Sequence, residues 1–274
     1  MRRTTGAVSC PNCGRLVAAT EPRCPFCDAW QPGLFGFGPW LHRTFGVFDL
    51  TQAITVACVV LYVASLLLDP SAFLHWGGFM DWLAPTSIAL FSLGMTGGPM
   101  SPHAAWWTLC TAIFLHGSLL HIAFNMVIMR RFLPMVEHLY GPARAFVVFM
   151  VAGAVGFVCS DLAHPSTPTI GASGAIFGLL AALVTYGWRT GQRQATSQIG
   201  MMALIMFAYG LFTPAVDNFA HLGGFVGGLG ASMLMPTSRP REGAVTWMLA
   251  AAFALVTLGG VVCSYLIVHG MIGG

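Results

Sequence analysis

Residues 171–188 read Gly171-Ala-Ser173-Gly174-Ala-Ile-Phe-Gly178-Leu-Leu-Ala-Ala-Leu-Val-Thr-Tyr-Gly-Trp188, an apolar segment without a charged residue. A helix needs about 20 such residues to cross a bilayer, so this segment predicts a membrane span. Further apolar runs predict spans at residues 50–69, 115–133, 143–162, 198–213, 217–236 and 245–268. The sequence therefore predicts an all-α polytopic membrane protein, with a six-helix core at 50–236 and a loop and seventh transmembrane helix at 237–274.

The composition of the chain agrees with this fold class. Of its 274 residues, 56% are hydrophobic and only 8% are charged. The mean hydropathy of +0.75 lies well above the range of water-soluble globular domains, which excludes a soluble enzyme. The net charge of +3 forms no basic stripe, so no nucleic-acid binding is expected.

The arginines set the expected orientation in the membrane. All 12 basic residues are arginines, and a cytoplasmic N-terminus places every one of them on the cytoplasmic side. The same orientation places Asp69, Asp81, Asp161 and Asp217 on the opposite side. The positive-inside rule thus predicts a cytoplasmic N-terminus and an extracytoplasmic C-terminus. A chain without lysine is typical of a GC-rich genome, which favours a bacterial plasma membrane as the location.

Four of the eight cysteines lie near the N-terminus, as Cys10-Pro-Asn-Cys13 and Cys24-Pro-Phe-Cys27. Two such pairs with ten residues between them are typical of a site where four thiolates bind one Zn2+ tetrahedrally. The alternatives are two structural disulfides, which need an oxidising compartment, or a redox-active pair, which normally sits on a strand-to-helix turn. Residues 1–28 are therefore expected to form a zinc ribbon that needs its metal to fold. Such a ribbon would recruit a soluble partner, and residues 29–49 are expected to form a linker or interfacial segment.

Polar side chains within the expected spans are candidates for a functional site, because an unpaired polar group is costly in hydrocarbon. His121 and Asn125 are four residues apart and share one face of the second span. Ser173 opens the fourth span, and His221 lies near the start of the sixth. All three spans run inward from the outer face, so these groups are expected at one common depth of about 10 Å.

Glycine spacing offers a way to bring two of these groups together. Gly174 and Gly178, like Gly224 and Gly228, are each spaced G-x-x-x-G, which lets helix backbones approach closely. The serine of the fourth span would then reach the histidine of the sixth. An imidazole that accepts the serine proton creates a nucleophile, and free N–H groups at a helix N-terminus stabilise an oxyanion. The pattern predicts acyl transfer, in the form of peptide-bond hydrolysis within the membrane.

Each of these features also has a purely structural interpretation. A serine in a small-residue span is often only a contact between helices, and glycine pairs often serve packing alone. A membrane histidine often satisfies a neighbouring carbonyl. His116 is rotated off the face shared by His121 and Asn125, and it is interpreted either as a supporting hydrogen-bonding residue or as an oxyanion ligand. The common depth of the polar groups favours the functional interpretation.

Together these motifs resemble the rhomboid family of intramembrane serine proteases. The stretch from Glu137 to Arg144 resembles a further family motif, E-x-x-x-G, so the resemblance extends over residues 50–236. The three main motifs are H-x-x-x-N at His121 and Asn125, G-x-S-G from Gly171 to Gly174, and H-x-x-G-x-x-x-G at His221, Gly224 and Gly228.

The resemblance implies a role for each of these residues. Ser173 would be the nucleophile, and His221 would be the general base and acid of a Ser-His dyad. His121, Asn125 and the backbone N–H of Ser173 would form the oxyanion hole. The supporting residues would be His116, Gly171, Gly174 and Gly224.

The activity implied by the resemblance is cleavage of transmembrane segments of other membrane proteins, within the lipid and without a catalytic cofactor. The rival interpretation is a catalytically silent membrane-protein binder or chaperone, although the chain retains both Ser173 and His221. A transporter would need charged residues in the middle of its spans, and the sequence places none there. One departure from the family is Trp106-Trp107-Thr108 where many members carry Trp-Arg, so the hydrogen bonds of that arginine must be replaced or absent.

Overall fold

The computed structural model describes residues 5–10, 15–26, 49–73, 78, 81–100, 103–165, 167–213, 216–237 and 242–272. The chain divides into two compact units, Met1–Gln52 and Ala53–Gly274. Buried hydrophobic clusters occur in both units, so each is described by itself.

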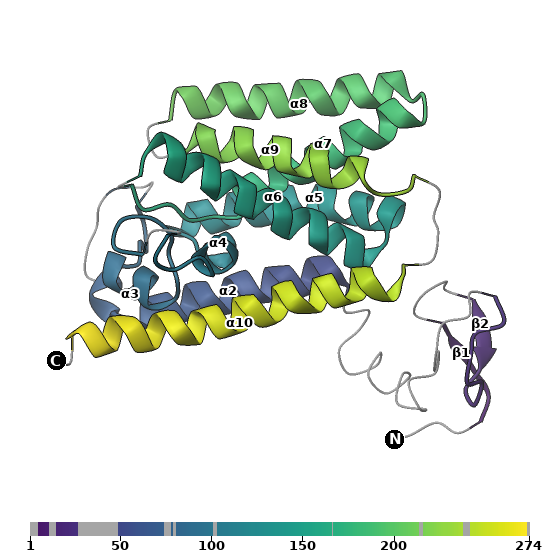
Figure 1. The fold of residues 1–274 in the computed structure, drawn as a ribbon, viewed down its shortest axis with the longest axis horizontal. Coiled ribbons are helices and arrows are strands. Elements are labelled where there is room, and N and C mark those ends of the chain that lie inside the picture. Colours follow the sequence, from purple (N-terminus) through teal and green to yellow (C-terminus); the bar gives the residue numbers. More distant parts are fainter. Residues whose placement is uncertain are drawn as a thin grey trace. The chain divides into compact units, whose positions relative to one another are not determined.

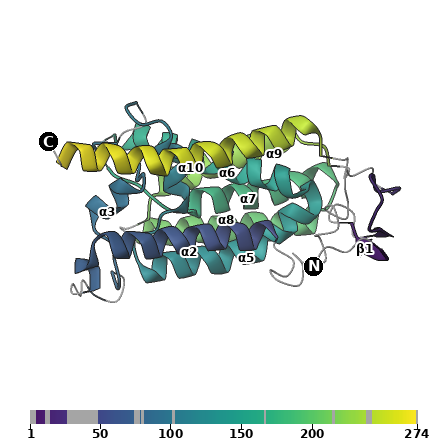
Figure 2. The ribbon, with the colours of Figure 1, turned by 90° about the horizontal axis from the view of Figure 1, so that it is seen from below.

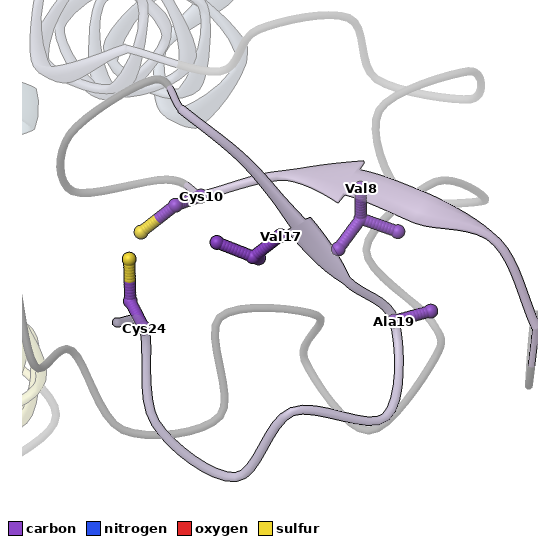
Figure 3. Close-up of a cluster of buried hydrophobic side chains, with 5 residues drawn as sticks. All are labelled: Val8, Cys10, Val17, Ala19 and Cys24. Carbon is purple, nitrogen blue, oxygen red and sulfur yellow. The ribbon is translucent and has the colours of Figure 1, made fainter. Parts of the chain in front are cut away.

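The N-terminal unit contains a two-stranded antiparallel sheet. Strand β1 (Ala7–Ser9) pairs with β2 (Leu16–Ala18), and Val8 lies opposite Val17. The buried side chains are Val8, Cys10, Val17, Ala19 and Cys24, and the sulfur atoms of the two cysteines point toward one another (Figure 3). The sheet and its buried side chains lie within residues 7–24, and folded segments below about 40 residues usually need a metal or disulfides.

The second unit is helical. Its long helices are α2 (Leu50–Leu68), α5 (Leu119–Tyr140), α6 (Pro142–Ala163), α7 (Ser173–Arg189), α8 (Arg193–Leu211), α9 (Asn218–Met233) and α10 (Ala244–Ile272) (Figure 1). Between α2 and α5 lie four short helices, η2 (Pro70–Phe73), α3 (Ser87–Ser92), α4 (Thr108–Thr111) and η3 (Ala112–Phe114). Each of the seven ranges that the apolar runs predict as spans therefore overlaps one long helix, with ends that differ by up to seven residues.

Four of the described helices, α2, α5, α6 and α10, are long and apolar enough to cross a membrane. Helices α7 and α9 have only 17 and 16 residues. Helix α8 is long enough, but its first turns carry arginine, glutamine, threonine and serine. A helical chain with four such apolar segments agrees with an all-α polytopic membrane protein, whereas the count of seven spans stays a prediction.

The boundaries of α5 differ from the predicted span at 115–133. The helix begins at Leu119 because Ser118 caps it, accepting a hydrogen bond from the backbone N–H of His121 at 3.2 Å. It continues past Pro134 to Tyr140 and ends at Gly141, whose φ of 96° favours glycine. As a result, His116 lies in the turn before the helix and not within the second span, which corrects the prediction from the apolar pattern.

Helix α6 occupies the centre of the helical unit. It is buried along most of its length and packs against α7, α9 and α10. Figure 2, seen from below, shows α2 and α10 running lengthwise along the face of the helical unit that is turned to the viewer. Helix α8 lies at the edge, next to α7 and α9, and of its side chains and glycines only Ala203 and Gly210 are buried.

Two charged side chains close helix ends far from the candidate site. The guanidinium of Arg189, the last residue of α7, donates to the backbone oxygens of Met235 at 2.6 Å and Ser232 at 3.3 Å, at the end of α9. The carboxylate of Glu242 accepts from the backbone N–H of Arg144 at 2.8 Å, in the first turn of α6. Burial raises the pKa of the Glu242 carboxyl above its ordinary value, and the hydrogen bond from Arg144 offsets only part of this shift. These contacts tie α7 to α9 and the start of α10 to α6.

Candidate active site

Ser173 is the first residue of α7, and no side chain caps the start of this helix. The N-cap residue is Ala172, which makes no side-chain hydrogen bond to the helix. Ser118 caps α5 and Asp217 caps α9, whereas α6 and α8 also begin without a side-chain cap. The first backbone N–H groups of an uncapped helix have no partner within it and carry partial positive charge. The amides of Ser173 and the next residue are therefore placed to bind a negatively charged oxygen.

The backbone that leads into Ser173 is held by the segment before α5. The N–H of Gly171 donates to the backbone oxygen of Ala112 at 2.9 Å, and the N–H of Thr169 donates to that of Thr96 at 2.9 Å. Gly171 has a φ of 122°, a conformation that L side chains rarely adopt. The glycine of the G-x-S-G motif is thus required by the turn that presents the serine.

His221 lies in the first turn of α9, and its imidazole ring stacks on Phe177. The two ring centroids are 4.3 Å apart with an interplanar angle of 19°. Phe177 follows Ser173 by four residues, so both side chains lie on the same face of α7. The Nδ1 atom of His221 is buried without a hydrogen-bond partner. The stack holds the imidazole on the face of α7 that carries the serine, while the Ser173–His221 hydrogen bond itself stays a prediction.

The glycine pairs bring α7 and α9 into backbone contact, as their spacing predicts. A Cβ atom at Gly224 would lie 2.6 Å from the carbonyl carbon of Gly174, and one at Gly228 would lie 2.7 Å from that of Gly178. Real Cβ atoms do not approach so closely, so only glycine fits there. The close approach of the two helices is therefore confirmed.

A second glycine face of α9 was not predicted. A Cβ atom at Gly223 would lie 2.6 Å from the sulfur of Cys159, and one at Gly227 would lie 2.8 Å from the Cβ of Val155, both on α6. Gly156 of α6 also faces α9, with 2.6 Å between a Cβ there and the backbone oxygen of Ala220. The repeated Gly-Gly pairs at 223–224 and 227–228 were the signal in the sequence, because adjacent glycines on a helix face two different neighbours.

His121 lies against the turn that presents Ser173. A Cβ atom at Gly171 would lie 2.8 Å from both Cε1 and Nε2 of the His121 ring, so the imidazole edge touches this glycine. Asn125, one turn further along α5, donates from Nδ2 to the backbone oxygen of His121 at 2.8 Å, and its Oδ1 is buried without a partner. The structure thus places His121 at the turn before Ser173, with Asn125 one turn deeper on the same helix.

His116 approaches the same place from the turn before α5. Its ring meets the His121 ring edge-on, with 5.1 Å between centroids, and its Nδ1 lies 3.3 Å from the backbone oxygen of Phe114. The side chain is completely buried, and its Nε2 has no partner. This position beside His121 agrees with the supporting role, and the choice between that role and a direct one stays open.

Asp217 joins three segments next to the candidate site. Its Oδ1 accepts from the backbone N–H of Ala220 at 3.0 Å and so caps α9. Its Oδ2 accepts from the hydroxyl of Ser160, near the end of α6, and from that of Thr169 at 3.5 Å. One carboxylate therefore holds the start of α9, which carries His221, against α6 and against the segment 167–172 that leads to Ser173. The sequence analysis assigned Asp217 only to the outer side of the membrane. Its position four residues before His221, at the start of a predicted span, was the signal that could have indicated its capping role.

Replacing Asp217 with Ala is expected to lower the free energy of unfolding by about 1–2 kcal/mol, because loss of an N-cap costs about 1 kcal/mol and the Ser160 hydroxyl loses its acceptor. The measurement is a denaturant titration of the protein in detergent micelles. The matched control is Asp49→Ala, since Asp49 accepts from the backbone N–H of Gln52 at 2.7 Å at the start of α2 without joining other segments. An equal loss in the two variants would contradict the linking role of Asp217.

The predicted zinc ligands are only partly visible. Cys10 and Cys24 are buried in the N-terminal unit, each with an exposed fraction of 1%, while Cys13 and Cys27 lie outside the described residues. Among the described residues no group of three or more His, Cys, Asp or Glu side chains is arranged to hold a metal ion. The convergence of the two cysteine sulfurs in Figure 3 fits half of the expected ligand set.

Comparison with known proteins identifies the helical region. Residues 103–238, about half of the chain, match the Rhomboid domain family. This region is similar to the Rhomboid domain. All candidate site residues from His116 to Gly224 lie within it.

Curated relatives of the rhomboid domain come from several kingdoms. The chain is 32% identical over 173 residues to Rhomboid protease GluP of Bacillus subtilis (strain 168), which covers 62% of this chain and 33% of that protein. It is 30% identical over 183 residues to Rhomboid-like protease 3 of Toxoplasma gondii, covering 64% and 65%. It is 32% identical over 151 residues to RHOMBOID-like protein 7 of Arabidopsis thaliana, covering 53% and 48%. The chain thus spans about a third to about two thirds of the length of these relatives.

The departure from the Trp-Arg pair lies inside the rhomboid domain, and the structure shows what replaces it. The indole Nε1 of Trp107 donates to the hydroxyl of Ser264 on α10 at 3.0 Å. The hydroxyl of Thr108 bonds within the loop, donating to the backbone oxygen of Ala105 at 2.6 Å. Hydrogen bonds are therefore present at this position, and one of them leads to the last helix of the chain.

Proposed function

We propose that this rhomboid domain is an intramembrane serine endopeptidase, with Ser173 as nucleophile and His221 as general base and acid. The observation that carries this proposal is the start of α7, where the serine stands at an uncapped helix N-terminus on the face that carries the His221 stack. The relatives named as rhomboid proteases support the same activity.

The chemistry follows from these positions. His221 takes the proton of the Ser173 hydroxyl, and the oxygen attacks the carbonyl carbon of the scissile peptide bond. The carbonyl oxygen becomes an oxyanion, which the backbone N–H of Ser173 and the side chains of His121 and Asn125 stabilise. His221 then returns the proton to the leaving amine. A water molecule hydrolyses the acyl-enzyme by the same proton exchange in reverse, so the protein ends unchanged. No cofactor takes part in these steps.

The substrates of this proposal are transmembrane segments of other membrane proteins. Such a segment reaches the site laterally, past α8, whose main contacts among the described helices are with α7 and α9. Hydrophobic side chains of α8 such as Met201, Leu204 and Ile205 are more than half exposed and face lipid in this proposal. The orientation is the one predicted from the arginines, with the N-terminus in the cytoplasm, the site opening toward the outer face, and a bacterial plasma membrane as the location.

The test of the proposed function is covalent labelling of the purified, detergent-solubilised protein by a fluorophosphonate probe, followed by cleavage of a reconstituted single-span substrate. Probe attachment requires an activated serine, so labelling is expected and cleavage products should appear. A folded protein that neither takes the probe nor cleaves would overturn the proposal. That outcome would favour the alternative of a catalytically silent membrane-protein binder or chaperone.

We further propose that residues 1–28 bind one Zn2+ through Cys10, Cys13, Cys24 and Cys27. The burial of Cys10 and Cys24 in one small cluster supports this set. In addition, the backbone N–H of Cys10 donates to the oxygen of Arg15 at 2.9 Å, which continues the pairing of β1 with β2 up to this cysteine. The metal would stabilise the fold of the unit, which then presents a surface to a soluble partner.

Substitution of Cys10 or Cys24 by Ser is expected to remove the metal, because a structural zinc site needs all four ligands. Elemental analysis should find one zinc per chain in the wild type and none or nearly none in these variants. Cys263→Ser on α10 is the control and should retain the full amount, since this cysteine lies far along the chain and is exposed. Zinc that stays bound after loss of either ribbon cysteine would refute the assignment.

A further inference from the structure

Helix α10 packs against two different parts of the helical unit. Along its first half, Ala250 and Phe253 contact Ala143 and Val147 of α6. Along its second half it packs against α3 and α4, the short helices between α2 and α5 (Figure 1). The second contact is made with the segment 86–115, named here the first outer loop, and not with a long helix.

The contact between α10 and the first outer loop is built around Trp107. The indole of Trp107 donates to the hydroxyl of Ser264, a side chain that is fully buried. One turn earlier, a Cβ atom at Gly260 would lie 2.9 Å from Cδ1 of Trp107 and 2.9 Å from Cγ2 of Thr111. The indole therefore lies directly on the α10 backbone, where only glycine leaves room. Gly259, the preceding residue, faces open space.

The first outer loop is also hydrogen-bonded to the segment 167–172, which leads to Ser173. Two of its backbone oxygens, those of Thr96 and Ala112, accept from the N–H groups of Thr169 and Gly171. The hydroxyl of Thr108, next to Trp107, also bonds to that of Thr96 at 3.1 Å. The loop thus contacts α10 on one side and the backbone around Ser173 on the other.

A hydrophobic cluster follows the same route. Leu90, Leu93, Met95 and Leu115 of the first outer loop form its buried part. Val261 of α10 and Ile170, three residues before Ser173, both pack against this cluster. Polar and apolar contacts therefore link α10 to the segment 167–172 through the same loop.

We propose that α10 positions the nucleophile, with Trp107 and Ser264 as positioning residues that hold the first outer loop against the segment 167–172 before Ser173. This inference rests on the proposed endopeptidase function. The seventh helix, which follows the rhomboid domain in the chain, then acts on the reaction without contacting the reacting atoms. If α10 lost its contact with Trp107, the turn at Gly171 would relax and the serine hydroxyl would be misplaced.

The test compares Gly260→Leu with Gly259→Leu in the full-length, detergent-solubilised protein. A leucine at Gly260 displaces Trp107, whereas one at Gly259 points into open space. The maximal rate of fluorophosphonate labelling is expected to fall by about tenfold or more in the first variant and to stay within about twofold in the second. The probe concentration for half-maximal rate should change little, because the probe does not contact α10. Equal labelling rates in the two variants would overturn the proposal.

A second pair of variants covers the case in which Gly260→Leu does not fold. Trp107→Phe keeps an aromatic ring and removes the N–H donor, and Ser264→Ala removes the acceptor. If the two act through their shared bond, the double variant should lose no more labelling rate than either single variant. Additive losses would contradict the link.

Hydrogen exchange separates this inference from the proposed function. The amides of Thr169 and Gly171 are expected to exchange faster in Gly260→Leu than in Gly259→Leu, because their acceptors lie in the displaced loop. If the wild type takes no probe, the proposed function fails, and the exchange rates still test whether α10 holds the loop. Unchanged exchange at both amides would refute that anchoring.

Discussion

Replacement of Ser173 by Ala is expected to abolish fluorophosphonate labelling and to lower cleavage of a transmembrane substrate by about 10⁴-fold or more. The hydroxyl is the only part of the side chain that changes, and in the proposed mechanism it forms the bond to the substrate carbonyl. The free energy of unfolding should change little, because no described helix cap depends on this hydroxyl. Labelling, cleavage and denaturant titration of the purified variant provide the measurement.

The matched control for this substitution is Ser65→Ala. Ser65 is a completely buried serine on α2, and its hydroxyl donates to the backbone oxygen of Tyr62 at 2.7 Å within the same helix. This variant should label and cleave like the wild type. Cleavage at the wild-type rate by Ser173→Ala would refute the assignment of the nucleophile. Loss of labelling in both variants would point to general damage from removal of a buried serine.

Replacement of Gly224 by Ala is expected to lower the free energy of unfolding by about 2 kcal/mol and to remove most of the activity. The added methyl group would lie 2.6 Å from the carbonyl carbon of Gly174, so α7 and α9 must move apart. That displacement separates Ser173 from His221, and proton transfer between them requires hydrogen-bond distance. Labelling rate and denaturant titration measured on one preparation would show both losses.

Gly230→Ala provides the comparison within the same helix. Gly230 faces open space, so a methyl group there meets nothing within 4 Å. Alanine favours a helix by up to about 1 kcal/mol over glycine, so this variant should be as stable as the wild type or more so, and equally active. If Gly224→Ala also labelled at the wild-type rate, the two helices would not need their close contact for the reaction.

The long helices could be predicted from the sequence because, in lipid, apolar composition decides which segments form spans. Each of the seven apolar runs overlaps one long helix, and the contact of α7 with α9 follows from glycine spacing. The start of α5 could not be predicted from hydropathy, since the Ser118 cap sets it and not the apolar pattern. Local hydrogen bonding thus overrides composition at helix ends.

The residues around the site were predicted in part. Ser173, His121 and His221 belong to local motifs, so their segments could be recognised one at a time. The ring stack of Phe177 on His221 and the link from Trp107 to Ser264 join residues far apart in the chain. Such pairs depend on how the helices pack around one another, and this packing cannot be predicted from local spacing in a single sequence.

The uncapped start of α7 has a consequence for the evolution of this chain. Its N-cap residue, Ala172, has helical backbone angles (φ −77°, ψ −4°), whereas a capping side chain needs an extended backbone at that position. The amides of the first turn therefore stay open to a ligand because of the backbone and not because of the alanine side chain. In the proposed mechanism that ligand is the oxyanion, so selection for turnover would act on the turn at Gly171 and not on the identity of residue 172.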